Sequence, residues 1–168
     1  MVILDASILF APVEGGLDLF EAIRDALAGP VQFVVTWETV VELERKAAKR
    51  PNGRFGRKFV LVKRYLTERG IWPTRAGEIS GSPGDRGQPL PAGGPRKDGG
   101  LPFRFDRGDE PVDEYLVSLA SEWKRRRPND RVFLATSDSA MAAEARAAGV
   151  PRLRLRGRGR AVKVQVFQ

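Results

Sequence analysis

Four acidic residues lie at positions in the sequence where their carboxylates could take part in catalysis or bind a metal ion. Asp5 and Asp138 each follow closely on a short apolar run, and Glu42 and Asp113 lie beside apolar residues in stretches of helical periodicity. A buried carboxylate costs several kcal/mol unless it is paired. Four acids in such surroundings therefore suggest either a set of arginine partners or a bound cation.

Each of the four acids also has an ordinary structural interpretation. An Asp at the end of a strand often caps the next helix, which is the alternative for Asp138, and Asp5 would also suit a turn. Glu42 and Asp113 would also suit solvated helix positions. Their joint placement, on two strand ends and two nearby helices, is more specific than the placement of any one of them.

The chain contains no Cys and no His, which limits the catalytic mechanisms and metal sites that are open to it. A thiolate nucleophile, an imidazole base, a Ser-His-Asp triad and a Cys-His zinc site are all excluded. Carboxylate oxygens select hard cations such as Mg²⁺ or Mn²⁺, which lower the pKa of water enough for attack on a phosphodiester. A metal-dependent nuclease or phosphatase is favoured. A haloacid-dehalogenase-type phosphatase is disfavoured, because it needs an Asp where this chain has Ser7.

The elements that must position these acids alternate along the chain. Apolar runs predict strands at 2–4, 31–35, 131–135, 151–156 and 161–167. Helical spacing predicts helices at 17–27, 36–48, 55–69, 109–127 and 139–148, with Asp109 as an N-cap. This alternation predicts an α/β fold with three α/β/α layers around a central, mostly parallel sheet. Ligands of such sheets bind outside the carboxyl ends of the strands, where Asp5 and Asp138 are expected.

A chain of 168 residues is expected to form one domain over residues 1–168. Within it, residues 77–102 change in character, because 13 of these 26 positions are Gly or Pro. Such a segment buries too little apolar surface to offset its ordering entropy. We predict a flexible insertion loop here, with a lid over a functional site as the alternative.

The formal net charge of +8 makes polyanions the first class of partner to consider, and RNA and DNA are the commonest of them. An Arg-rich composition also suits a high-GC genome or a heat-stable protein. The charge is segregated, however: residues 45–69 hold ten bases and one acid, whereas residues 1–44 hold eight acids and one base. The candidate nucleic-acid contacts are Lys46, Lys49, Arg50, Arg54, Arg57, Lys58, Arg152, Arg154 and Arg156. The alternatives are a solvated helical surface for the first six and a charge-protected edge strand for the last three.

Several short motifs, in order along nearly the whole chain, resemble those of the PIN-domain ribonucleases. They are VILDASILF with Asp5, VVELERKA with Glu42, VDEYLVSLA with Asp113, FLATSDSAM with Asp138, and the AGVP of 148–151. PIN proteins have a central parallel sheet between helices and a quartet of acids that bind Mg²⁺ or Mn²⁺. The resemblance implies that these four acids are that quartet. It also implies that Ser7 and Thr136 orient a carboxylate or a water beside the metal.

The chain departs from some PIN subfamilies. The segment 77–102 separates Glu42 from Asp113 more widely than in compact toxin members, and the zinc-binding Cys and His of some ribosome-maturation members are absent. The LDLFEAI helix, the long middle segment and the ending from TSD to AGVP look more like archaeal PIN proteins of ribosomal RNA processing than VapC-type toxins.

The expected function is therefore that of a Mg²⁺- or Mn²⁺-dependent endoribonuclease acting on single-stranded or structured RNA, in RNA processing. The alternatives are a non-catalytic RNA- or protein-binding module and a toxin ribonuclease of a toxin–antitoxin pair. A homodimer, an antitoxin and a ribosome-assembly partner are the candidate protein interactions. No apolar run approaches the roughly 20 residues that span a bilayer, so we expect a cytoplasmic protein without a membrane partner.

Overall fold

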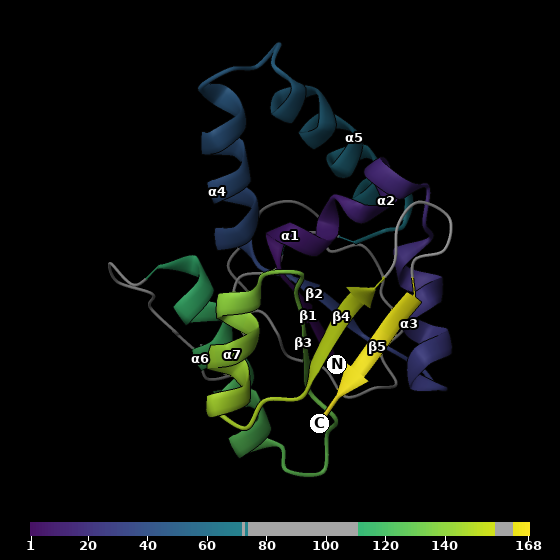
Figure 1. Cartoon of the computed structure of the whole chain (residues 1–168), viewed down its shortest axis with the longest axis vertical. Coiled ribbons are helices and arrows are strands. Elements are labelled where there is room, and N and C mark those ends of the chain that lie inside the picture. The colour runs from purple at the N-terminus through teal and green to yellow at the C-terminus, as the bar shows by residue number, and fades with distance from the viewer. Residues whose placement is uncertain (72, 74–110, 157–162) are drawn as a thin grey trace, which may run out of the picture.

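The computed structural model describes residues 1–71, 73, 111–156 and 163–168 (Figure 1). Its strands are β1 (Val2–Leu4), β2 (Phe33–Val35), β3 (Phe133–Ala135), β4 (Arg152–Arg156) and β5 (Lys163–Phe167). Its helices are α1 (Ala6–Leu9), α2 (Ala11–Gly15), α3 (Leu19–Leu27), α4 (Trp37–Ala48), α5 (Arg54–Glu68), α6 (Val112–Arg126) and α7 (Ser139–Ala147). The expected insertion at 77–102 lies outside the described residues.

The five strands form one sheet in the order β2-β1-β3-β4-β5. Strand β1 lies between two parallel neighbours, so that Ile3 is opposite Val34 on β2 and Leu134 on β3. Strand β4 runs parallel to β3, and β5 closes the edge in the antiparallel direction. The expected mostly parallel sheet is confirmed, and its carboxyl edge carries the residues that follow β1, β2 and β3.

The pleat of the sheet divides the core into two layers, because successive side chains of a strand point to opposite faces. Ile3, Val34 and Leu134 are buried with residues of α6 and α7. Val2 and Leu4 are buried on the other face, with residues of α1, α3, α4 and α5. Figure 1 shows α6 and α7 on one side of the sheet and α3 on the other. Each fully buried aliphatic side chain contributes roughly 1.5–3 kcal/mol.

The structure differs from the sequence expectations at two places. Two short helices, α1 and α2, connect β1 to α3, and they were not predicted because four or five residues do not display a helical period. Helix α6 begins at Val112, with Pro111 in the capping position and no side-chain cap, whereas Asp109 had been expected there. Asp109 itself lies outside the described residues. None of the helices within the described residues is long and apolar enough to cross a membrane.

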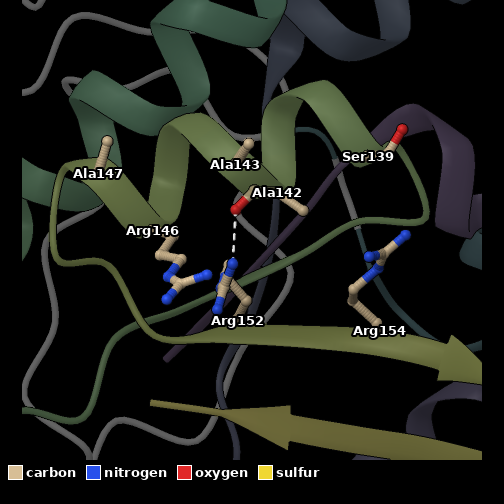
Figure 2. Close-up of a pocket in the computed structure, with 7 residues that line it drawn as sticks. All are labelled: Ser139, Ala142, Ala143, Arg146, Ala147, Arg152 and Arg154. Atoms are coloured by element: carbon tan, nitrogen blue, oxygen red, sulfur yellow. Dashed lines mark hydrogen bonds between the residues drawn. The ribbon is translucent and has the colours of Figure 1, made fainter.

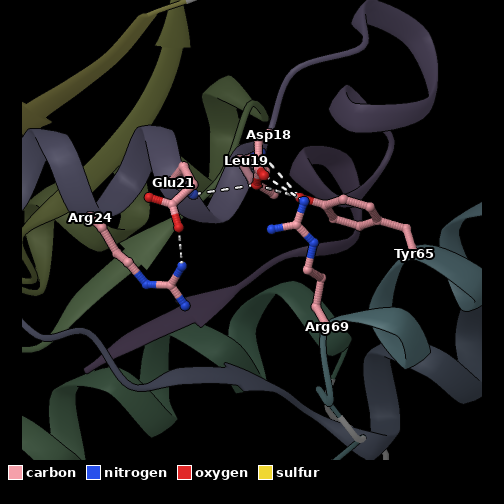
Figure 3. Close-up of polar contacts among 6 residues, drawn as sticks. All are labelled: Asp18, Leu19, Glu21, Arg24, Tyr65 and Arg69. Carbon is pink, nitrogen blue, oxygen red and sulfur yellow. Dashed lines mark hydrogen bonds and ion pairs between the residues drawn. The ribbon is translucent and has the colours of Figure 1, made fainter.

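A polar cluster joins α3 to α5 (Figure 3). Asp18 caps α3, and its carboxylate accepts hydrogen bonds from the hydroxyl of Tyr65 at 3.1 Å and from the guanidinium of Arg69 at 2.5 Å. The same hydroxyl accepts the backbone N–H of Leu19 at 3.2 Å. Burial alone would raise the pKa of Asp18, but these bonds outweigh it and lower the pKa. Burial and the Asp18 carboxylate together raise the pKa of Tyr65 to about 12.

We predict that Tyr65→Phe destabilises the protein by about 1–2 kcal/mol at neutral pH, because it removes the hydroxyl that bridges Asp18 and the start of α3. The unfolded chain releases the tyrosine proton near pH 10, whereas the folded protein holds it to about pH 12. The stabilisation by the hydroxyl is therefore complete below pH 10 and is lost as the pH rises toward 12. Urea unfolding of both proteins between pH 8 and pH 12 measures the difference. A difference that stays constant across this range would contradict the assignment.

Candidate active site

Asp5 is the most firmly held acid at the carboxyl edge of the sheet. It directly follows β1, caps α1 and is only 4% exposed. Its Oδ2 atom accepts hydrogen bonds from the backbone N–H of Ser7 at 3.2 Å, from the Ser7 hydroxyl, and from the Thr136 hydroxyl at 2.8 Å. No donor among the described residues bonds its Oδ1 atom. One oxygen of this carboxylate is thus anchored by three hydrogen bonds, and the other has none from the described residues.

Asp138 likewise accepts hydrogen bonds from the described residues at only one of its two carboxylate oxygens. It is the N-cap of α7, as the ordinary interpretation of the sequence allowed, and its Oδ1 accepts the backbone N–H groups of Ala140 at 2.7 Å and Met141 at 3.0 Å. Within the part of the chain that the structure describes, Oδ2 has no donor. The capping role therefore orients the side chain and leaves one oxygen unbonded.

Thr136 connects the two aspartates. Its fully buried hydroxyl donates to Asp5 and accepts the backbone N–H of Asp138 at 2.9 Å. The Ser7 hydroxyl lies 3.3 Å from the Thr136 hydroxyl and accepts the backbone N–H of Ser137 at 2.9 Å. These two hydroxyls, which the family resemblance had singled out, tie the end of β1 to the end of β3.

Glu42 and Asp113 approach from the helices. Glu42 lies in the second turn of α4 and forms an ion pair with Lys46, four residues further on, at 2.5 Å. Asp113 lies in the first turn of α6. Partial burial raises the pKa of Asp113, and the negative charges of Asp5, Glu42 and Asp138 raise it further, while Lys46 opposes the shift. The four acids therefore share one electrostatic neighbourhood at this edge of the sheet.

The surroundings of these acids are more open than the sequence suggested. We expected four carboxylates in apolar surroundings, but only Asp5 of the four is buried, while Asp113 and Asp138 are exposed and the side chain of Glu42 is 24% exposed. The reason is that the first turns of α6 and α7 lie at the rim of the sheet, where their polar positions face solvent. Apolar neighbours in sequence pack into the core without covering the acid between them.

Within the described ranges the structure shows no arginine partners for these acids, one of the two explanations that the sequence offers. Among the described residues no Lys or Arg forms an ion pair with Asp5, Asp113 or Asp138. Nor do three or more acids of the described ranges lie close enough together to form a ready-made metal cage. The donor set still fits Mg²⁺ or Mn²⁺, because such ions are usually held by one or two carboxylates together with waters and substrate phosphates.

The six basic candidates between Lys46 and Lys58 differ in whether they form ion pairs with acidic residues. Lys46 pairs with Glu42, and Lys58 pairs with Glu14, so part of their charge is already compensated. The spacing of Lys46 and Glu42 could have revealed their pairing from the sequence. The exposed remainder surrounds the α4–α5 turn and consists of Lys49, Arg50, Arg54 and Arg57.

The α4–α5 turn is tightly packed at Gly56, in the first turn of α5. A side chain there would place its Cβ 2.3 Å from the backbone oxygen of Pro51, which real contacts do not allow. The exposed bases therefore project from a turn of defined geometry.

The second group of basic candidates lies on β4. Arg152, Arg154 and Arg156 alternate with buried or half-buried leucines, so the three guanidinium groups share one face of the strand. Between this face and α7 is a groove of about 470 Å³, shown in Figure 2. Arg146 of α7 also lines it. Arg146 is not recognisable as a candidate from the sequence, because only the packing of α7 against β4 brings it beside the strand.

Comparisons with known proteins agree with this architecture. No protein-family model matches the sequence, and no curated protein matches it. The structure is similar to a solved structure described as the PIN domain endonuclease Utp24, with a TM-score of 0.58 and 14% sequence identity. The match covers 99% of this chain and 91% of that one. The expected PIN-like α/β fold is confirmed, and at 14% identity the likeness extends to the fold alone.

We predict that Asp113→Asn stabilises the metal-free protein at pH 7 by roughly 0.5 kcal/mol, the scale of interactions between partly exposed charges. The raised pKa means that folding brings the Asp113 carboxylate into unfavourable surroundings once it is ionised. The gain should therefore disappear below about pH 3.9, where the group is protonated even in the unfolded chain. Thermal unfolding in EDTA at several pH values measures it. The exposed Asp25→Asn variant is the control, and equal behaviour of the two variants would contradict a shared acidic neighbourhood.

Proposed function

We propose that the protein is a Mg²⁺- or Mn²⁺-dependent endoribonuclease. The observation that carries the proposal is the pair of strand-end aspartates, Asp5 and Asp138. They are joined through Thr136, and each keeps one carboxylate oxygen free of hydrogen bonds from the described residues. The likeness of the fold to that of a PIN domain endonuclease supports a nuclease.

In this proposal Asp5, Glu42, Asp113 and Asp138 hold the cation, and Ser7 and Thr136 keep the Asp5 carboxylate in place. A bound divalent ion lowers the pKa of water and offsets charge that develops on the phosphate. The protein contributes orientation: Oδ2 of Asp5 is fixed by three hydrogen bonds, so binding costs little further ordering of this side chain. No side-chain base is required, in keeping with a chain that has no His.

The choice of RNA as the substrate rests on charge. The exposed bases Lys49, Arg50, Arg54 and Arg57 lie at the far end of α4 from the sheet, whereas Glu42 lies near its beginning. Figure 1 shows α4 leading from the sheet to this turn. Phosphate contacts along that path would guide a strand toward the acids, since such contacts dominate affinity for nucleic acids.

Within this function we favour a role in RNA processing over that of a toxin, on the sequence resemblance to archaeal PIN proteins of that kind. A homodimer and a ribosome-assembly partner are compatible with it, as is a cytoplasmic location. A non-catalytic RNA-binding module is the second candidate function. It is favoured by one observation, that no three acids of the described residues form a ready-made metal cage.

Cleavage of labelled single-stranded RNA tests the proposal. We expect wild type to cut the strand internally with Mn²⁺ or Mg²⁺ and to be inactive in EDTA. Asp5→Asn keeps the shape of the side chain but removes its charge, and should lower the rate by roughly 100-fold or more, equivalent to about 2.7 kcal/mol or more of transition-state stabilisation. The exposed Asp25→Asn variant should cut like wild type. Tight RNA binding without cutting on varied RNAs would instead favour the binding module.

A further inference from the structure

The groove between α7 and β4 is lined by small residues and bases. Three alanines of α7 form its wall, so the backbone of a ligand could approach closely. None of the lining residues that the structure describes is acidic. The polar lining residues are Ser139, Arg146, Arg152 and Arg154 (Figure 2).

Arg152 lies between Arg146 and Arg154 in the groove and is held there by two contacts (Figure 2). Its Nη1 atom donates to the backbone oxygen of Ala142 at 2.7 Å, and its guanidinium lies 5.5 Å from the ring centre of Phe167. Its Nε–H is buried and has no acceptor among the described residues. A charged donor that is already immobilised loses little entropy when it binds an anion.

Arg146 and Arg154 are free of ion pairs with the described residues, in contrast to many bases elsewhere in the chain. Figure 2 shows the guanidinium groups of Arg146 and Arg152 side by side, and Arg154 toward the end where Ser139 lies. Like charges held close together repel one another. An anion in the groove would relieve this repulsion, and phosphate accepts two parallel hydrogen bonds from a guanidinium.

The position of the groove relates it to the acids. Ser139 directly follows Asp138, so one end of the groove adjoins the proposed active site. The groove then follows α7, whose nine residues extend about 13 Å. Figure 1 shows α7 below the level of α1 and the α4–α5 turn above it. The groove and the α4–α5 turn therefore extend from the acids in different directions.

We propose that the α7–β4 groove binds the phosphodiester backbone of the RNA strand on one side of the scissile bond. This inference rests on the proposed ribonuclease function for the identity of the strand. No aromatic residue is among the described residues that line the groove, so in this proposal the groove binds phosphates and does not select bases. The α4–α5 turn then holds the strand on the other side of the cut.

The test measures binding of a labelled single-stranded RNA in EDTA, which stops metal-dependent cutting, over a range of NaCl concentrations. The double variant Arg146→Gln/Arg154→Gln should raise the Kd at least about tenfold at low salt. It should also reduce the slope of log K against log salt by about 1.4, since each lost phosphate contact on a single strand is worth about 0.7. The matched control is Arg24→Gln/Arg125→Gln, which removes the same charge at bases that pair with Glu21 and Glu122. It should change the slope far less.

Equal slopes for the groove variant and the charge-matched control would overturn the groove, because net charge alone would then explain the binding. Arg146→Lys/Arg154→Lys should restore most of the slope if phosphates are bound there. The NMR signals of the arginine side chains are followed while inorganic phosphate and then RNA are added. This titration distinguishes binding of free phosphate from binding of the RNA backbone. Phosphate that RNA fails to displace would also overturn the proposal. Melting temperatures within about 2 °C of wild type verify the folding of all variants.

Cutting of the same RNA with Mn²⁺ separates this inference from the proposed function. One result is that wild type binds RNA without cutting it and the groove variant loses that binding. This result would support the groove as an RNA-binding site and contradict the nuclease function. If wild type cuts RNA and the groove variant binds RNA like the charge-matched control, the nuclease function is supported and the groove is not an RNA-binding site.

Discussion

The hydroxyl of Thr136 holds the carboxyl edge of the sheet together. It donates to the buried carboxylate of Asp5 and accepts the backbone N–H of Asp138, so the ends of β1 and β3 share one hydrogen-bond network. Two acids that would repel one another are thereby kept at neighbouring strand ends by neutral donors. Loss of such a bridge would leave a buried carboxylate oxygen short of one donor, at a cost of about 1–3 kcal/mol.

The sheet topology makes this network possible. Because β1 lies between two parallel neighbours, the residues after β1, β2 and β3 emerge at the same edge. Helices α4 and α7 begin there, and their N-termini favour negative charge. Negative charge therefore collects at the edge, while bases lie outside it, exposed on the α4–α5 turn and partly buried along the face of β4. This division fits the proposed RNA substrate, because a divalent ion held by the acids would offset their repulsion of its phosphates.

Much of this arrangement was predictable from the sequence, and the exceptions have physical reasons. The strand-end acids follow short apolar runs that are typical of buried strands, so Asp5 and Asp138 could be placed at one edge. The openness around Asp113 was not predictable, because periodicity shows which side of a helix is buried and not what lies beyond its first turn. The α7–β4 groove was also missed, since Arg146 and Arg152 meet only through tertiary packing.

The central claim is that these acids form one divalent-cation site at the carboxyl edge of the sheet. Titration of isotope-labelled protein with Mn²⁺, followed by NMR, tests it directly, because the paramagnetic ion broadens signals only near its binding site. The account predicts that broadening begins at the amides around Asp5, Asp113 and Asp138 and is lost in the Asp5→Asn variant. Broadening that spreads evenly over the exposed acids, or that begins around Glu122 or Glu144, would contradict it.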